Sequence, residues 1–166
     1  MPPIQPIAIQ DIEQLPLISQ AVITENYLDV MGHMNVRYYL ALFDEASWTF
    51  FQSFGMTETY YKDSLAGAFA LEHHIRYLSE VRLGETVHIH ARLLQRNAKR
   101  IHFMYFMVNV NKAVLSATLE SVVSHTNLKQ RRTSPYPPEI AVHLDAIIAE
   151  HSQLGWDAPV NGHMGV

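Results

Sequence analysis

The apolar positions that follow residue 35 recur with the spacing of an amphipathic helix. They are Val36, Tyr39, Leu40, Phe43, Ala46, Phe50, Phe51 and Phe54. Asn35 suits the N-cap of such a helix, because its side-chain oxygen can accept a hydrogen bond from an unpaired amide of the first turn. Gly55 suits the C-terminal end. The pattern therefore predicts one long helix of about five turns that begins at Val36.

Beyond residue 66 the chain has the alternating pattern and the turns of β-strands. Strands are predicted over residues 17–23, 69–78, 86–95, 101–110 and 114–126. Short turns join the last three of them, which predicts an antiparallel meander. The expected fold class is α+β, with one long central helix wrapped by a curved antiparallel sheet of about five strands, since the apolar stripe of the helix must pack against a sheet face.

Length and composition indicate a single folded domain. The chain has 166 residues, of which 48% are hydrophobic. Residues 1–16 are rich in proline and are expected to form a flexible leader. Residues 17–138 are expected to form the domain, and residues 139–166 a C-terminal helix with a loose tail.

Charge and residue content exclude several function classes. A net charge of -4 argues against a nucleic-acid partner bound by bulk electrostatics. The absence of cysteine excludes disulfides, Cys-ligated zinc and cysteine nucleophiles. No apolar run reaches the ~18 residues of a membrane span, and the start of the chain lacks the features of a secretory signal, so a cytoplasmic protein without a membrane partner is expected. The histidines show no spacing typical of a metal site, and no metal is expected.

The segment from Asp29 to Asn35, just before the predicted helix, combines features that suit chemistry on a carbonyl group. The Asp29 carboxylate can act as a nucleophile or as a general base for water. A helix N-terminus offers unpaired amides and a positive dipole end, which stabilise the oxyanion formed when a thioester is attacked. Gly32 allows the backbone to approach a ligand closely.

This segment resembles a motif of the hotdog-fold thioesterases. Asp29-Val-Met-Gly-His-Met-Asn35 is similar to the Asp-x-x-Gly-His-(Val/Met)-Asn-x-x-Tyr motif of the 4-hydroxybenzoyl-CoA thioesterase-like branch. The run from Tyr38 to Ser47 is similar to thioesterases of carnitine and betaine catabolism. The resemblance covers residues 17–138. It implies a hotdog fold and an enzyme that hydrolyses acyl-CoA to a carboxylic acid and free coenzyme A without a cofactor.

The resemblance also implies roles for individual residues. Asp29 matches the catalytic carboxylate, and His33 and Asn35 match the residues that flank the site. The backbone amide of Val36 is expected to donate to the oxyanion. The motif departs from the family at Val36, where many members have a second Asn, and at Tyr27, where some carry a carboxylate. The plainer alternatives are a turn residue at Asp29, a buried structural histidine at His33 and a simple helix cap at Asn35.

Further side chains are candidates for binding the substrate. Tyr38 and Glu45 lie on the predicted helix, and the alternatives are a packed aromatic and a solvated carboxylate. Glu72 and His74 share one face of a predicted strand and are expected to line the acyl pocket, unless they are paired at an interface. Aromatic candidates for the same pocket, with a place in the core as the alternative, are Phe50, Phe54, Phe69, Tyr77 and Tyr105.

Two basic clusters are candidates for the phosphates of coenzyme A. One comprises Lys129, Arg131 and Arg132, and the other lies at residues 96–100. The alternative for either is an ordinary solvated charge cluster. Because the family places its sites at a dimer interface, a homodimer or homotetramer is expected.

Two other functions stay open. One is a hydratase or dehydratase of acyl thioesters, in which a histidine would act as base and Glu45 as acid. The other is a non-catalytic module that binds acyl-CoA, because a fold does not fix a function. The acyl group is also open among betainyl, short-chain, medium-chain and aromatic groups. Aromatic side chains could bind a betainyl cation by cation–π contact.

Overall fold

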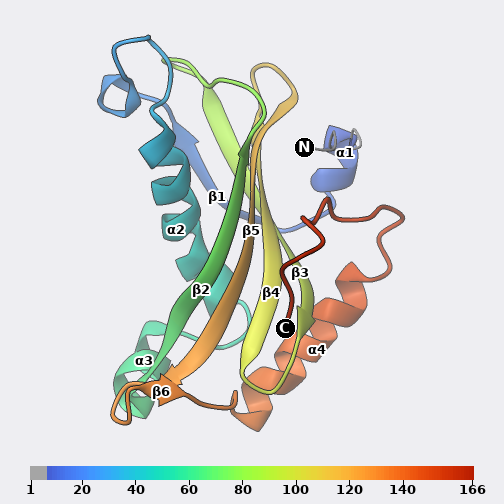
Figure 1. Cartoon of the computed structure of the whole chain (residues 1–166). Coiled ribbons are helices and arrows are strands. Elements are labelled where there is room, and N and C mark those ends of the chain that lie inside the picture. The colour runs from blue at the N-terminus through green and yellow to red at the C-terminus, as the bar shows by residue number, and fades with distance from the viewer. Residues whose placement is uncertain (1–6) are drawn as a thin grey trace.

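The computed structural model describes residues 7–166, in which a curved sheet wraps one long helix (Figure 1). The helices are α1 (Ile9–Ile12), a short 3-10 helix η1 (Glu25–Tyr27), α2 (Val36–Gln52), α3 (Glu58–Ser64) and α4 (Pro138–His151). The strands are β1 (Leu17–Val22), β2 (Ala66–Tyr77), β3 (Thr86–Arg96), β4 (Arg100–Asn109), β5 (Val114–Asn127) and β6 (Arg132–Thr133).

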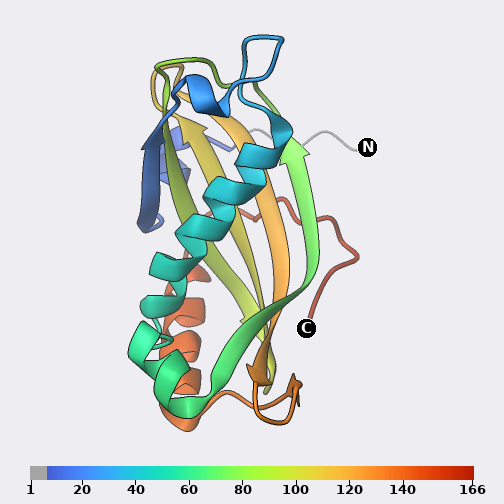
Figure 2. The same ribbon diagram turned by 90° about the vertical axis from the view of Figure 1, so that its left-hand side faces the viewer.

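The sheet is antiparallel and has the order β1-β3-β4-β5-β2, with the two-residue strand β6 paired to β5. Strands β3, β4 and β5 form the predicted meander, whereas β2 crosses over to pair with β5. Helix α2 lies against the concave face of the sheet (Figure 2). The predicted α+β hotdog architecture, with a long helix beginning at Val36, is confirmed.

Aromatic side chains fill the space between α2 and the sheet. Phe43 and Phe50 of α2 and Phe54 beyond it are buried against Phe103 and Tyr105 of β4. The Phe50 ring lies 5.2 Å from that of Phe103 and 5.5 Å from that of Tyr105, measured between centroids. Burying a side chain of this size contributes about 1.5–3 kcal/mol. Phe50 and Phe54 are therefore core residues, which decides between the core and the acyl pocket for these two side chains.

The convex face of the sheet is also covered, by segments from both ends of the chain. Ile12 of α1 and Leu15 are buried against Met104, Phe106 and Val108 of β4. The expected flexible leader is thus corrected for residues 7–16, which hold part of a second core. Residues 1–6 lie outside the described residues. Residues 7–16 pack there because β4 carries apolar side chains on both faces. The side chains on its convex face must therefore also be buried by another segment.

The C-terminal segment is held in the same way, which corrects the expected loose tail. The Trp156 ring packs on Phe106, with centroids 5.5 Å apart, and the Arg92 guanidinium stacks on Trp156 at 4.3 Å. Arg92 also donates hydrogen bonds to the carbonyls of Trp156 and His151, at 2.8 and 3.1 Å. Residues 139–166 therefore pack against the sheet that they follow.

Candidate active site

The loop that precedes α2 is folded into a tight turn around Asp29. The Met31 amide donates to Asp29 Oδ1 at 2.9 Å, and the Asp29 amide donates to the His33 carbonyl at 3.1 Å. Gly32 closes the turn with φ +81°, a left-handed conformation that costs glycine little. Beyond the turn, the Met34 amide donates to the carbonyl of Val81 at 2.7 Å and ties the loop to the main fold.

Asp29 and His33 form a partly accessible carboxylate–imidazole pair. The His33 Nδ1 atom lies 3.7 Å from Asp29 Oδ2, and the two side chains are 30% and 15% exposed, respectively. One carboxylate oxygen is occupied by the Met31 amide, so Oδ2 is the oxygen that faces His33. The pair is open enough to meet a substrate and is held in place by the turn.

The start of α2 offers an unpaired amide beside a cavity. Asn35 caps the helix, because its side-chain oxygen accepts from the Arg37 amide at 3.1 Å. The Tyr38 amide donates to the Asn35 carbonyl at 3.0 Å. Within residues 7–166, the Val36 amide has no hydrogen-bond partner. Val36 and His33 line a cavity of about 260 Å³, together with Met34, Tyr39, Tyr77, Leu78, Ser79 and Glu80. An oxyanion could be bound there by the amide and the helix dipole.

Two of the predicted substrate-binding residues on α2 do not face this cavity. The Tyr38 ring packs edge-on against Tyr27, with centroids 5.0 Å apart, and its hydroxyl accepts from Arg37 at 3.0 Å. Tyr38 is thus a packed aromatic that supports the loop. Glu45 is exposed and lines none of the cavities described for residues 7–166. The exposure of Glu45 agrees with the alternative of a solvated carboxylate.

Glu72 and His74 point to the convex face of the sheet, away from α2. The reason is a β-bulge between Ala70 and Glu72, which reverses the face on which the later residues of β2 lie. His74 instead lies 3.7 Å from the buried carboxylate of Glu120. His73, and not Glu72 or His74, lines the cavity between α2 and β2, and the ion pair of His74 with Glu120 agrees with the alternative of a paired residue.

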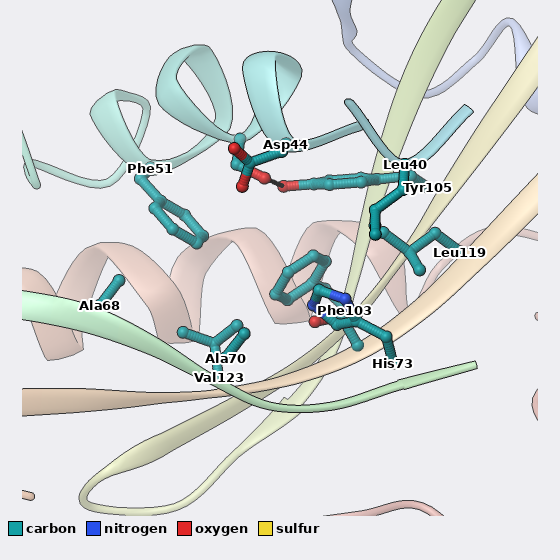
Figure 3. Close-up of a pocket in the computed structure, with 12 residues that line it drawn as sticks. Leu40, Asp44, Phe51, Ala68, Ala70, His73, Phe103, Tyr105, Leu119 and Val123 are labelled. Atoms are coloured by element: carbon teal, nitrogen blue, oxygen red, sulfur yellow. Dashed lines mark hydrogen bonds between the residues drawn. The ribbon is translucent and has the colours of Figure 1, made fainter. Parts of the chain in front are cut away.

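Two adjoining cavities of about 90 and 440 Å³ lie between the middle of α2 and strand β2. Both are lined by Asp44, Ser47, Phe51 and Ala68. Figure 3 shows Asp44 and Phe51 of α2 facing Ala68, Ala70 and His73 of β2. The sequence analysis missed Asp44. The signal was present, because Asp44 stands four residues from both Leu40 and Trp48 and interrupts an otherwise apolar stripe.

The basic cluster at Lys129, Arg131 and Arg132 lies beside β6, at the end of the chain fold opposite to the start of α2 (Figure 1). One chain therefore does not bring this cluster to Asp29. In the other cluster, Arg96 is occupied by Asp145, with Nε 2.6 Å from Oδ1. Arg131 and Arg132 line a cavity of about 430 Å³ together with exposed apolar residues of β2.

Two further features of residues 7–166 concern metal ions and membranes. No group of three His, Cys, Asp or Glu side chains in this range is arranged to hold a metal ion. Nor does any helix of the described chain combine the length and the apolar character needed to cross a lipid bilayer.

Comparison with known families decides the class. The family model of the thioesterase-like superfamily matches residues 23–144. The chain belongs to this superfamily. The Asp29 loop, α2 and every strand from β2 to β6 lie within the matched range, so the predicted thioesterase family is confirmed at the level of family and fold.

Relatives and solved structures agree with this assignment. The chain is 31% identical, over 80% of its length, to L-carnitine dehydrogenase/betainyl-CoA thioesterase of Rhizobium meliloti (strain 1021), of which it spans only 26%. It is 26% identical to betainyl-CoA thioesterase of Pseudomonas aeruginosa, covering 77% of this chain and 80% of that protein. The fold matches that of the protein SAV2348 from Staphylococcus aureus, solved in complex with CoA, with a TM-score of 0.81 at 20% identity over 92% of this chain and 96% of that one.

Proposed function

We propose that this protein hydrolyses acyl-CoA thioesters at the start of α2, with Asp29 as the reactive carboxylate. The observation that carries the proposal is that Asp29 lies 3.7 Å from His33, which lines one cavity with Val36 and its unpaired amide, in a chain of the thioesterase-like superfamily. A carboxylate and an oxyanion donor are the two groups that thioester hydrolysis requires from the protein.

Two routes start from this geometry. In one, Asp29 takes a proton from a water molecule as the water oxygen attacks the thioester carbon. In the other, an Asp29 oxygen attacks the carbon itself and forms a mixed anhydride, which water then hydrolyses. In both routes the Val36 amide stabilises the oxyanion, and the C–S bond breaks to release the coenzyme A thiolate. A single turnover in ¹⁸O-water identifies the anhydride route when water attacks the Asp29 carboxyl carbon, because the product then keeps an unlabelled oxygen from Asp29 and the label enters Asp29. Water attack on the acyl carbon, with or without an anhydride, places the label in the product.

We further propose that the active unit is a dimer formed along strand β2. This strand is an unpaired edge of the sheet, and it exposes Phe69 (65% exposed) and Leu71. Long edge strands with apolar side chains are usually covered, because they pair readily with another strand. Two copies related by a twofold axis would pair their β2 strands antiparallel. The Tyr77 end of one strand would then face the Ala66 end of its partner.

This dimer gives the basic cluster a role. Lys129, Arg131 and Arg132 lie near the Ala66 end of β2, since β6 pairs with β5 beside it. The twofold arrangement brings this cluster of one subunit toward the Asp29 loop of the other. Its side chains could then bind the phosphates of coenzyme A in the neighbouring site. The dimer thereby unites two groups that a single chain keeps at opposite ends (Figure 1).

The test is coenzyme A release, followed with a thiol reagent, across betainyl, short-chain, medium-chain and aromatic thioesters. The proposal predicts release from at least one of them. Tight binding of acyl-CoA without release would favour a binding module, and conversion without a free thiol would favour a hydratase.

Light scattering tests the dimer, and Leu71→Lys is expected to reduce dimer content and activity together. A fully active monomer would contradict the shared site.

A further inference from the structure

The side chain of Asp44 is a carboxylate without a counterion at the wall of a cavity. It lines both cavities between α2 and β2, and within residues 7–166 it takes part in no hydrogen bond or salt bridge. His73 lines the smaller cavity together with Asp44. Burial lowers the pKa of His73 from 6.5 more than the charge of Asp44 raises it. At neutral pH the imidazole is therefore mostly neutral and leaves the charge of Asp44 uncompensated.

Three aromatic rings form part of the wall around this charge, and the rest is Ser47, Leu128 and the small residues at the start of β2. Trp48 and Tyr61 meet edge to face, with centroids 5.7 Å apart, and Phe51 adds a third ring. Burial raises the pKa of Tyr61 to about 12, so its hydroxyl stays neutral. The Ser47 hydroxyl is already engaged with the Phe43 carbonyl and the Tyr105 hydroxyl, both at 3.1 Å. The cavity is thus lined by aromatic rings and by one carboxylate that has no ion-pair partner within residues 7–166.

We propose that this cavity binds the quaternary ammonium end of an acyl group, with Asp44, Trp48 and Tyr61 as the residues that determine specificity. A quaternary ammonium has no N–H to donate, so hydrogen-bonding groups cannot select it. Aromatic faces attract it through their quadrupole, and a nearby carboxylate supplies a longer-range attraction. An uncompensated carboxylate among aromatic rings provides both interactions, and it disfavours an anionic or a purely apolar acyl group.

The distance along α2 indicates which subunit the cavity serves. Asp44 lies eight residues beyond Val36, or about 12 Å along the helix at 1.5 Å per residue. A short acyl group whose carbonyl lies at Val36 cannot span that length within one chain. In the twofold dimer, however, the start of α2 in one subunit faces the Ala66–Ala70 end of β2 in the other, and the cavity lies against that end. Asp44 therefore acts on the substrate of the partner subunit. This inference rests on the proposed thioesterase function.

The experiment compares two substrates of the same shape. Betainyl-CoA carries a trimethylammonium group, and 3,3-dimethylbutyryl-CoA replaces its nitrogen with carbon and removes the charge. We expect Asp44→Asn to lower kcat/KM for betainyl-CoA by about tenfold or more and to leave the neutral isostere nearly unchanged. Asp63→Asn, which removes an exposed carboxylate of α3 that lines neither cavity, is the matched control and should affect neither substrate.

Equal losses on both substrates, or a wild-type enzyme that prefers the neutral isostere, would overturn the specificity proposal while leaving the thioesterase function intact. If wild type releases coenzyme A from no thioester at all, the proposed function fails and the inference fails with it. Circular dichroism and thermal unfolding confirm that each variant is folded. Because Asp44 is exposed, its substitution is expected to leave folding unaffected.

A subunit-mixing experiment tests the placement across the dimer. Asp29→Asn and Asp44→Asn proteins are unfolded together and refolded, so that about half of the dimers contain one copy of each. If the two residues act on one substrate from different subunits, each mixed dimer has one intact site, and betainyl-CoA activity recovers to about a quarter of wild type. If activity does not recover although mixed dimers form, Asp44 does not serve the partner's site.

Discussion

The protein contains two carboxylate–histidine pairs whose surroundings differ in almost every respect. Asp29 and His33 lie on a loop, 3.7 Å apart and partly exposed. Glu120 of β5 and His102 of β4 lie within the sheet, 2.9 Å apart, with only 0% and 2% of their side chains exposed. Asp29 and His33 still have atoms that can form hydrogen bonds to a ligand. The hydrogen-bonding atoms of Glu120 and His102 are already paired with other groups of the protein.

The contacts of Glu120 show what the second pair does. Its other oxygen accepts from the Asn161 amide at 2.7 Å, and the Gln95 side chain bonds to His102 Nδ1 at 3.1 Å. Since Gln95 donates to Nδ1, His102 carries its proton on Nε2 and donates to Glu120. The network links two strands to the C-terminal tail. Identical chemical groups thus serve structure where they are buried and satisfied, and are available for reaction where they are accessible.

The largest effect is expected from Glu120→Ala, which breaks the buried pair. The substitution leaves the His102 N–H and the Asn161 amide without their acceptor in a dry environment. Each buried donor left without an acceptor costs about 1–3 kcal/mol of unfolding free energy. Urea denaturation measures this loss. Turnover per folded molecule should stay near that of wild type, and a selective loss of turnover would show that the buried pair takes part in catalysis.

Substitution in the accessible pair, Asp29 and His33, should lower activity and leave stability almost unchanged. His33→Ala removes the group that faces Asp29 Oδ2, and a misplaced reactive group costs up to about 10²-fold in rate. Because the His33 side chain is partly exposed, the unfolding free energy should change by less than about 0.5 kcal/mol. Steady-state kinetics and urea denaturation of the same variant check both parts. A destabilised variant with normal kcat/KM would identify His33 as a structural residue.

A smaller effect concerns Gly32, which shapes the loop of the accessible pair. Alanine at φ +81° is strained by about 1–2 kcal/mol, although no atom lies within 4 Å of the added Cβ. We therefore expect Gly32→Ala to lower the unfolding free energy slightly and to lower kcat/KM by a larger factor than the change in stability explains. Gly84→Ala, also at positive φ in open space, is the matched control and should lower stability without the same loss of kcat/KM. Equal activity in both variants would contradict a shaping role for the Gly32 turn.

Folding stability is expected to decrease gradually as the pH is lowered, because burial keeps several histidines neutral in the folded chain. Burial lowers the pKa of His90, His125 and His151 below 6.5. The unfolded chain takes up protons as the pH falls through 6.5, while the folded chain resists them, so stability decreases from that point downward. In His151 the neutral Nδ1 accepts from the Leu93 amide at 2.9 Å. Urea denaturation at pH 7.5 and 5.5 should show this loss, and His151→Asn should reduce it. A pH-independent stability would contradict the assignment.

The sequence was sufficient for the features that depend on local patterns. Helix α2 begins at Val36 as predicted, because the apolar period and the Asn35 cap are both local. The bulge after Ala70 was not predicted, because it is set by pairing with β5 and leaves no signal in the period of two. The packing of Ile12 and Leu15 was missed for the same reason, since it depends on the second face of β4. Nothing in the order of residues indicated that Asp44 would lie beside His73.

The central claim is that Asp29 is the reactive carboxylate, and the most direct test is kcat/KM for coenzyme A release by Asp29→Asn beside wild type. The substitution keeps the size of the side chain and an oxygen for the Met31 amide, so urea denaturation should show a nearly unchanged stability. We predict a loss of about 100-fold or more. A folded Asp29→Asn variant that releases coenzyme A at the wild-type rate would contradict the account.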